Sequence, residues 1–260
     1  MIVLKCMGIF LSWFLGMQIA GLVLNSLQIQ YSAILTSQII MLFLIFFVKK
    51  KSEIIWNKTA WNEKEKINVI YITGAVFTGI GTAFFNQISV LMSMNIKIPE
   101  KTGGVEITLS YVLLALTAAI VEEFFYRGTI MNLCMTRFKA GIAIFISSLF
   151  FCIGHLSPVM FAHTFVCGIL CGYYYYYSGR IMIPVTIHFI NNLIWGCIIP
   201  VFLYCTGGDG STVDSSYSFS EGEIIITVMS VIIGIMIITI TAIWMKKYNR
   251  NLLNQKGEEE

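Results

Sequence analysis

The chain has 260 residues, of which 57% are hydrophobic and only 12% are charged, and its net charge is +3. Such a composition excludes an ordinary soluble domain and predicts a single integral membrane domain over residues 1–260. The basic residues follow the pattern of a membrane protein's loops, so the small positive charge indicates the lipid bilayer, and no nucleic acid, as a partner.

Apolar stretches of bilayer length follow one another along the chain. They cover about residues 7–27, 31–48, 68–94, 107–135, 140–157, 159–177, 181–203 and 223–245. We therefore expect an all-α fold, a polytopic membrane helical bundle of about eight transmembrane helices. Its charged and polar residues within the spans predict an active-site cavity inside the membrane.

The basic residues predict how the bundle is oriented. Of the 17 Lys and Arg, all but Lys97 and Lys101 lie at the chain ends or in the even-numbered loops, such as 49–67. By the positive-inside rule, both termini are cytoplasmic, and the acidic loop 204–222 is external. We expect a multi-pass protein of the cell membrane, and its compact length favours a bacterial source. The tyrosines 173–177 predict an aromatic belt at the interface, followed by a turn at 178–180.

Two carboxylates and a guanidinium interrupt the span 107–135. Each such group at the centre of a bilayer costs about 2.5 to 3.5 kcal/mol, so the cluster indicates partners and a function. Glu123 precedes Arg127 by four residues, which predicts an ion pair that supports the helix. Glu122 points about 100° away on the same helix, so it remains available as a base.

Two further spans carry polar residues that we expect near Glu122. A helical hairpin that turns at residues 139–141 would place Glu122 and His155 at nearly equal depth, since each lies about sixteen residues from the turn. His188 and Asn192 are four residues apart on the span 181–203 and share a helix face. This face offers two hydrogen-bond donors to one oxygen atom.

Together these residues resemble the three ordered motifs of the CAAX prenyl protease and bacteriocin-processing family of intramembrane endopeptidases. The motifs are Glu122-Glu123-x-x-x-Arg127, Phe151-x-x-x-His155 and His188-x-x-x-Asn192. The resemblance covers about residues 110–200, the expected protease core.

The resemblance implies an endopeptidase that hydrolyses a peptide bond of a membrane-associated protein or peptide. It assigns Glu122 and His155 to activation of the attacking water, and His188 and Asn192 to stabilisation of the oxyanion. Glu123 and Arg127 support the site, and Phe151 is expected to orient His155. The expected role is maturation of a bacteriocin, a signalling peptide or a leader.

A metal ion is an open alternative for the activation of water. Glu122, His155 and His188 could supply a zinc site with two histidines and one carboxylate. However, the chain has no His-Glu-x-x-His helix, and a glutamate with a histidine can activate water unaided. The sequence therefore favours a metal-free site and leaves Zn²⁺ open.

Two other interpretations remain at the level of sequence. A non-catalytic bacteriocin-immunity or scaffold protein of the membrane is the main alternative to an enzyme, since relatives are linked to bacteriocin self-protection. A transporter is disfavoured because no inverted repeat or pair of broken helices is visible. His163 lies outside the three motifs, and we expect it to be structural.

Overall fold

The computed structural model describes residues 2–26, 69–93, 109–198 and 221–257. These residues form helices joined by turns and contain no strand, so the all-α prediction is confirmed for this part of the chain. In chain order the helices are α1 (Ile2–Ser26), α3 (Val69–Phe85), α4 (Gln87–Ser93), α5 (Leu109–Phe125), the π-helix η2 (Tyr126–Met131), α6 (Asn132–Met135), α7 (Ala140–Gly154), α8 (Phe161–Ser178), α9 (Met182–Leu193), the π-helix η3 (Ile194–Ile198) and α11 (Glu221–Gly257). The predicted span 31–48, the loop 49–67 and most of the loop 204–222 lie outside the described residues.

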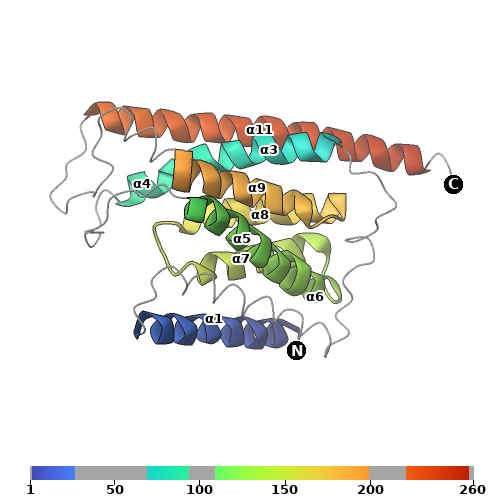
Figure 1. The fold of residues 1–260 in the computed structure, drawn as a ribbon. Coiled ribbons are helices and arrows are strands. Elements are labelled where there is room, and N and C mark those ends of the chain that lie inside the picture. The colour runs from blue at the N-terminus through green and yellow to red at the C-terminus, as the bar shows by residue number, and fades with distance from the viewer. Residues whose placement is uncertain (1, 27–68, 94–108, 199–220, 258–260) are drawn as a thin grey trace.

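The long helices pack as layers of one bundle. In Figure 1, α11 and α3 lie along one side, α9 and α8 come next, α5 and α7 follow, and α1 closes the opposite side. The cytoplasmic location of the two termini stays a prediction.

Glycines let α3 approach two neighbouring helices closely. A Cβ atom added at Gly79 would lie 2.9 Å from the carbonyl oxygen of Ile187 in α9. One added at Gly81 would lie 3.0 Å from the side chain of Ile237 in α11. Because only a residue without a side chain fits such contacts, the sequence of α3 determines its position between α9 and α11.

Two turns arrange the helices that carry the motifs. Lys139 has an extended backbone (φ −61°, ψ 151°), which ends the first helical arm before α7 begins. The arms of the hairpin are joined where the hydroxyl of Ser147 donates to the carbonyl of Tyr126 at 2.8 Å. α8 ends at Gly179, whose φ of 65° suits glycine, so the predicted turn at 178–180 is confirmed.

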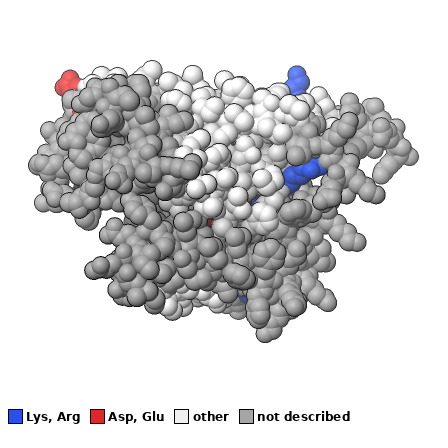
Figure 2. All heavy atoms as spheres, viewed as in Figure 1, with Lys and Arg blue, Asp and Glu red and all other residues white. Residues whose placement is uncertain are grey.

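The described residues include two helices long and apolar enough to cross a membrane, Val69–Met92 and Glu221–Leu252. They fit a membrane protein, but the predicted number of eight spans is not confirmed. α11 also exposes large apolar side chains, among them Ile226 and Ile240 at 67% each, which suits contact with lipid better than with water. In Figure 2, acidic atoms appear near one end of the bundle and basic atoms near the other, and the described surface between them is almost uncharged.

The tyrosine run does not form a uniform interfacial belt. Tyr174 is buried, and its hydroxyl shares a hydrogen bond with that of Thr78 at 2.9 Å. Tyr175 is also buried and accepts a hydrogen bond from the amide of Asn132 at 2.9 Å. The belt prediction is therefore wrong for these two residues, because the helical turn directs them inward, where their hydroxyls find partners.

Candidate active site

The first motif lies where α5 ends and the π-helix η2 begins. Glu123 and Arg127 are fully buried, with 0% of each residue exposed, whereas Glu122 is partly exposed. Sequence periodicity does not indicate the π-helix, which begins at Tyr126, shortly after the two carboxylates. Single π turns inside helices are common at functional sites because they redirect side chains by part of a turn.

Glu123 and Arg127 form the ion pair that their spacing predicts. Nη1 of Arg127 lies 2.8 Å from Oε1 of Glu123, and Nη2 donates to the carbonyl of Gly168 in α8 at 3.0 Å. The guanidinium also lies over the ring of Phe151, 4.8 Å from its centroid. Arg127 therefore joins the first motif to α7 and α8 while the carboxylate balances its charge.

The same carboxylate of Glu123 also holds the third motif. Its Oε1 lies 3.0 Å from Nδ1 of His188 in α9, and the histidine side chain is almost completely buried. Because a carboxylate oxygen accepts, Nδ1 of His188 donates, and its Nε2 is the remaining functional nitrogen. The sequence did not predict this contact, since Glu123 and His188 lie on separate helices.

His155 caps the C-terminus of α7 with its ring in a defined tautomer. Its Nδ1 lies 2.8 Å from the carbonyl oxygen of Phe151, one turn earlier in the helix. Because a carbonyl oxygen only accepts, Nδ1 carries the proton and Nε2 of the neutral ring keeps a free lone pair. This form of His155 suits a group that takes a proton from water.

The ring of Phe151 contacts two of the candidate catalytic histidines. Its centroid lies 4.7 Å from that of His155 and 5.4 Å from that of His188, and the ring meets each imidazole edge-on. With the guanidinium of Arg127 on it as well, this phenyl ring contacts a residue from each of the three motifs. The motifs thus meet at one place in the bundle.

Glu122 lies near this cluster without belonging to its ion pair. Its Oε2 is buried and has no hydrogen-bond partner among the described residues. The carboxylate is close enough to His188 and Tyr126 to interact with both electrostatically. A buried carboxylate oxygen without a partner is unusual and is suited to bind a water molecule or a substrate proton.

Asn192 is held by its neighbour in the chain. The amide nitrogen of Asn191 donates to Oδ1 of Asn192 at 3.3 Å, and Oδ1 of Asn191 lies 3.0 Å from Nε2 of His163 in α8. The three motifs do not include Asn191. Its signal in the sequence is its position directly before Asn192 of the third motif.

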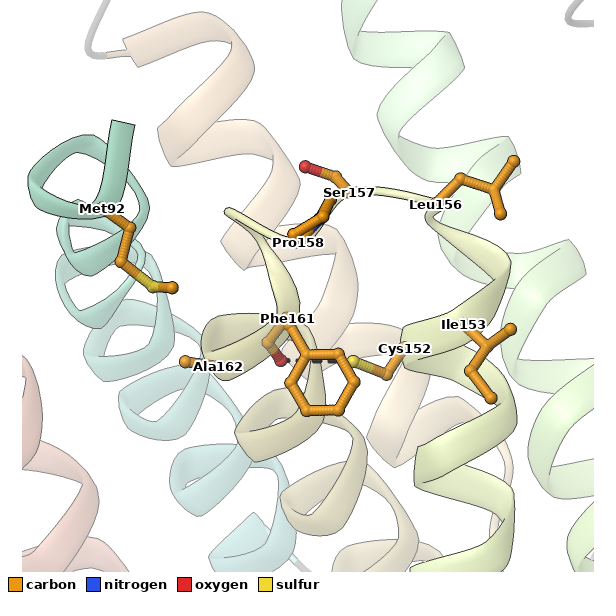
Figure 3. Close-up of a pocket in the computed structure, with 8 residues that line it drawn as sticks. All are labelled: Met92, Cys152, Ile153, Leu156, Ser157, Pro158, Phe161 and Ala162. Carbon is orange, nitrogen blue, oxygen red and sulfur yellow. Dashed lines mark hydrogen bonds between the residues drawn. The ribbon is translucent and has the colours of Figure 1, made fainter. Parts of the chain in front are cut away.

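An apolar cavity of about 450 Å³ opens beside the turn that follows His155 (Figure 3). Leu156, the next residue, has a φ of 48°, a left-handed conformation that costs a non-glycine residue about 1 to 2 kcal/mol. This conformation ends α7 directly after His155 and leads the chain along the cavity. The lining residues are Met92, Cys152, Ile153, Leu156, Ser157, Pro158, Phe161 and Ala162.

Residues 104–194 match one protein-family model, described as Rce1-like, type II CAAX prenyl endopeptidase. The resemblance inferred from the three motifs is confirmed. The matched segment covers about a third of the chain and includes every motif residue from Glu122 to Asn192. No curated protein and no solved structure matches the chain.

The match to CAAX-type endopeptidases implies a membrane-embedded protease. It does not decide how water is activated. Among the described residues, no three His, Cys, Asp or Glu side chains are grouped to hold a metal ion. Zinc binding by Glu122, His155 and His188 therefore stays open, and we derive no step through a metal.

Proposed function

We propose that this protein is an intramembrane endopeptidase that hydrolyses a peptide bond of a membrane-associated peptide or protein. The observation that carries the proposal is the meeting of all three motifs at the ring of Phe151, with Glu122 beside them. The match of residues 104–194 to CAAX-type endopeptidases supports the same reaction class.

In this proposal Glu122 and His155 activate the attacking water. Oε2 of Glu122, which has no hydrogen-bond partner among the described residues, and Nε2 of His155 are both proton acceptors. Whichever of the two takes a proton from the water makes the water oxygen nucleophilic. That oxygen forms a bond to the scissile carbonyl carbon. The proton then passes to the amide nitrogen as the carbon–nitrogen bond breaks, so the reaction consumes one water and leaves an acid and an amine.

His188 and Asn192 stabilise the negative charge on the carbonyl oxygen. Glu123 holds Nδ1 of His188, which leaves Nε2–H of the imidazolium to donate to the oxyanion. With Glu122 and Glu123 ionised, an imidazolium at His188 and the guanidinium of Arg127 make the cluster electrically neutral. Neutrality lowers the cost of keeping the buried groups of this cluster away from water.

The cavity next to His155 suits the apolar part of a membrane-anchored substrate. Its lining is almost wholly apolar. One of the lining residues is Leu156, which directly follows His155, the proposed water-activating histidine. A substrate that is anchored in lipid beside this cavity would reach the site without leaving the membrane. We propose maturation of a bacteriocin, a signalling peptide or a leader as the biological role.

A comparison of strains tests this function in the native host. One strain carries Glu122→Gln, and a control strain carries Glu221→Gln, which changes an exposed carboxylate at the start of α11. Mass spectrometry of membranes and medium should show a precursor accumulating, and its shorter product disappearing, only with Glu122→Gln. Identical peptide profiles in the two strains and the wild type would contradict the proposal.

A further inference from the structure

The three histidines of the chain lie near one another, although only two belong to the motifs. His163 in α8 is 3% exposed and lies within electrostatic range of His155 and His188. Its Nε2 is 3.0 Å from Oδ1 of Asn191, which comes directly before Asn192 on α9. His163 is therefore two hydrogen bonds away from the proposed oxyanion donor.

The two hydrogen bonds have a direction that the chemistry of the groups determines. Nε2–H of His163 donates to Oδ1 of Asn191, so the amide nitrogen of Asn191 faces the other way. That nitrogen donates to Oδ1 of Asn192 at 3.3 Å. With its oxygen occupied, Asn192 directs its own NH₂ group away from Asn191, and this end is the one that can donate to an oxyanion.

The opposite tautomer of His163 would reverse the chain of hydrogen bonds. A lone pair on Nε2 would require the amide nitrogen of Asn191 to turn toward the histidine. Oδ1 of Asn191 would then accept from the NH₂ group of Asn192, and that donor would be lost to the oxyanion. The proton position on His163 thus decides which face Asn192 presents.

Packing alone gives a weak reason for a histidine at this position. Nδ1 of His163 is buried without a hydrogen-bond partner among the described residues. A buried nitrogen without a partner costs about 1 to 3 kcal/mol, which an apolar side chain of similar size would avoid. The hydrogen bond between the other nitrogen, Nε2, and Asn191 offsets part of this cost and is the contact that a histidine provides here.

We propose that His163 is a positioning residue: it orients Asn191, which in turn holds Asn192 with its NH₂ group toward the oxyanion. The role of Asn192 in this inference rests on the proposed function. The direction of the hydrogen bonds does not, so the two can be tested separately.

The kinetic test compares variants in lipid vesicles with a quenched fluorescent peptide anchored by farnesyl-cysteine. His163→Leu removes the Nε2–H donor and should lower kcat by about 10- to 100-fold while KM stays unchanged. This loss is smaller than that expected when an oxyanion donor is removed completely. Asn191→Asp, which has no NH₂ group to donate, should do the same. His163→Gln should restore most of kcat, because its amide nitrogen can replace Nε2–H.

A double-mutant cycle separates positioning from a general structural effect. In an Asn192→Ala background, His163→Leu should have no further effect on kcat, because the group it positions is absent. Thr164→Val is the structural control, since Thr164 is the buried neighbour and bonds to Cys152 and Met160. It should lower thermal stability without changing kcat. Equal losses from His163→Leu in both backgrounds would overturn the proposal.

A measurement that needs no activity tests the hydrogen bonds themselves. In ¹⁵N spectra of protein labelled at histidine, the signal that disappears in His163→Gln should show a protonated Nε2 and an unprotonated Nδ1. A protonated Nδ1 with a bare Nε2 would overturn the positioning role. If this tautomer is found but wild type cleaves no peptide, the proposed function fails and the hydrogen-bond direction stands.

Discussion

Oε1 of Glu123 lies 3.0 Å from Nδ1 of His188, which joins the first motif to the third across two helices. The same oxygen accepts a hydrogen bond from Nη1 of Arg127 at 2.8 Å. One buried carboxylate therefore serves as counter-charge for a guanidinium and as acceptor for an imidazole. This arrangement supports different proposed roles for the two adjacent glutamates: Glu123 would organise the site, and Glu122, which is outside the ion pair, would be the base.

The change Glu123→Gln should destabilise the protein strongly. It leaves the fully buried guanidinium of Arg127 without its carboxylate partner. Breaking a buried ion pair in this way lowers the free energy of unfolding by about 3 to 5 kcal/mol. Glu122→Gln is the matched control, since it makes the same chemical change one residue earlier outside the ion pair. Unfolding in detergent should show a lower Tm for Glu123→Gln alone. Equal Tm values would contradict the organising role.

Arg127→Lys should also lower stability although it keeps the charge. A lysine presents a single ammonium and cannot bond Glu123 and the carbonyl of Gly168 in the way that the planar guanidinium does. A buried carbonyl that loses its donor costs about 1 to 3 kcal/mol. The control is Arg137→Lys at an exposed position, which should leave Tm unchanged. A Tm of Arg127→Lys equal to wild type would show that the second bond is unimportant.

Phe151→Leu should reduce kcat more than its neighbour Phe150→Leu. Phe151 contacts His155 and His188, and its loss lets both imidazoles move, whereas Phe150 packs against Phe10 of α1. Both changes remove an aromatic ring from α7, and Phe151→Leu should also lower the Tm more, because Phe151 is buried and Phe150 is only partly buried. The comparison of kcat at temperatures well below both Tm values measures the difference. Equal kcat values for the two variants would show that Phe151 has no role in the site.

Gly168→Ala should separate α7 from α8. A Cβ atom there would lie 2.9 Å from Cβ and 3.1 Å from Cα of Ser148, and the carbonyl that Arg127 binds would move with the helix. Overpacking of this kind costs about 1 to 3 kcal/mol. Gly141→Ala, where no atom lies within 4 Å, should leave Tm unchanged or raise it slightly. A Tm of Gly168→Ala equal to that of wild type would show that α7 and α8 can move apart at this position without loss of stability.

Local spacing in the sequence predicted the contacts within one helix. The ion pair of Glu123 and Arg127 follows from their positions four residues apart, and the turn at 178–180 belongs to the stretch that resembles the CAAX protease family. The hairpin before α7 followed from helix lengths alone. These features depend on neighbours in the chain, which the sequence displays directly.

Contacts between helices were harder to predict because they depend on how each helix is rotated about its axis. The bond from His188 to Glu123, and that from His163 to Asn191, required the rotation of α8 and α9 relative to α5. The π-helices η2 and η3 change that rotation next to the site, and hydrophobic periodicity does not indicate them. His163 was assigned a structural role because no motif contains it.

Hydrolysis by purified protein in lipid vesicles tests the central claim most directly. The substrates are two quenched fluorescent peptides, one anchored by farnesyl-cysteine followed by three apolar residues and one anchored by a palmitoyl chain, both in H₂¹⁸O. Wild type and Glu221→Gln should release a product with ¹⁸O in its new carboxylate, and Glu122→Gln should be about 10² to 10⁴ times slower. Cleavage by Glu122→Gln at the wild-type rate would contradict the account.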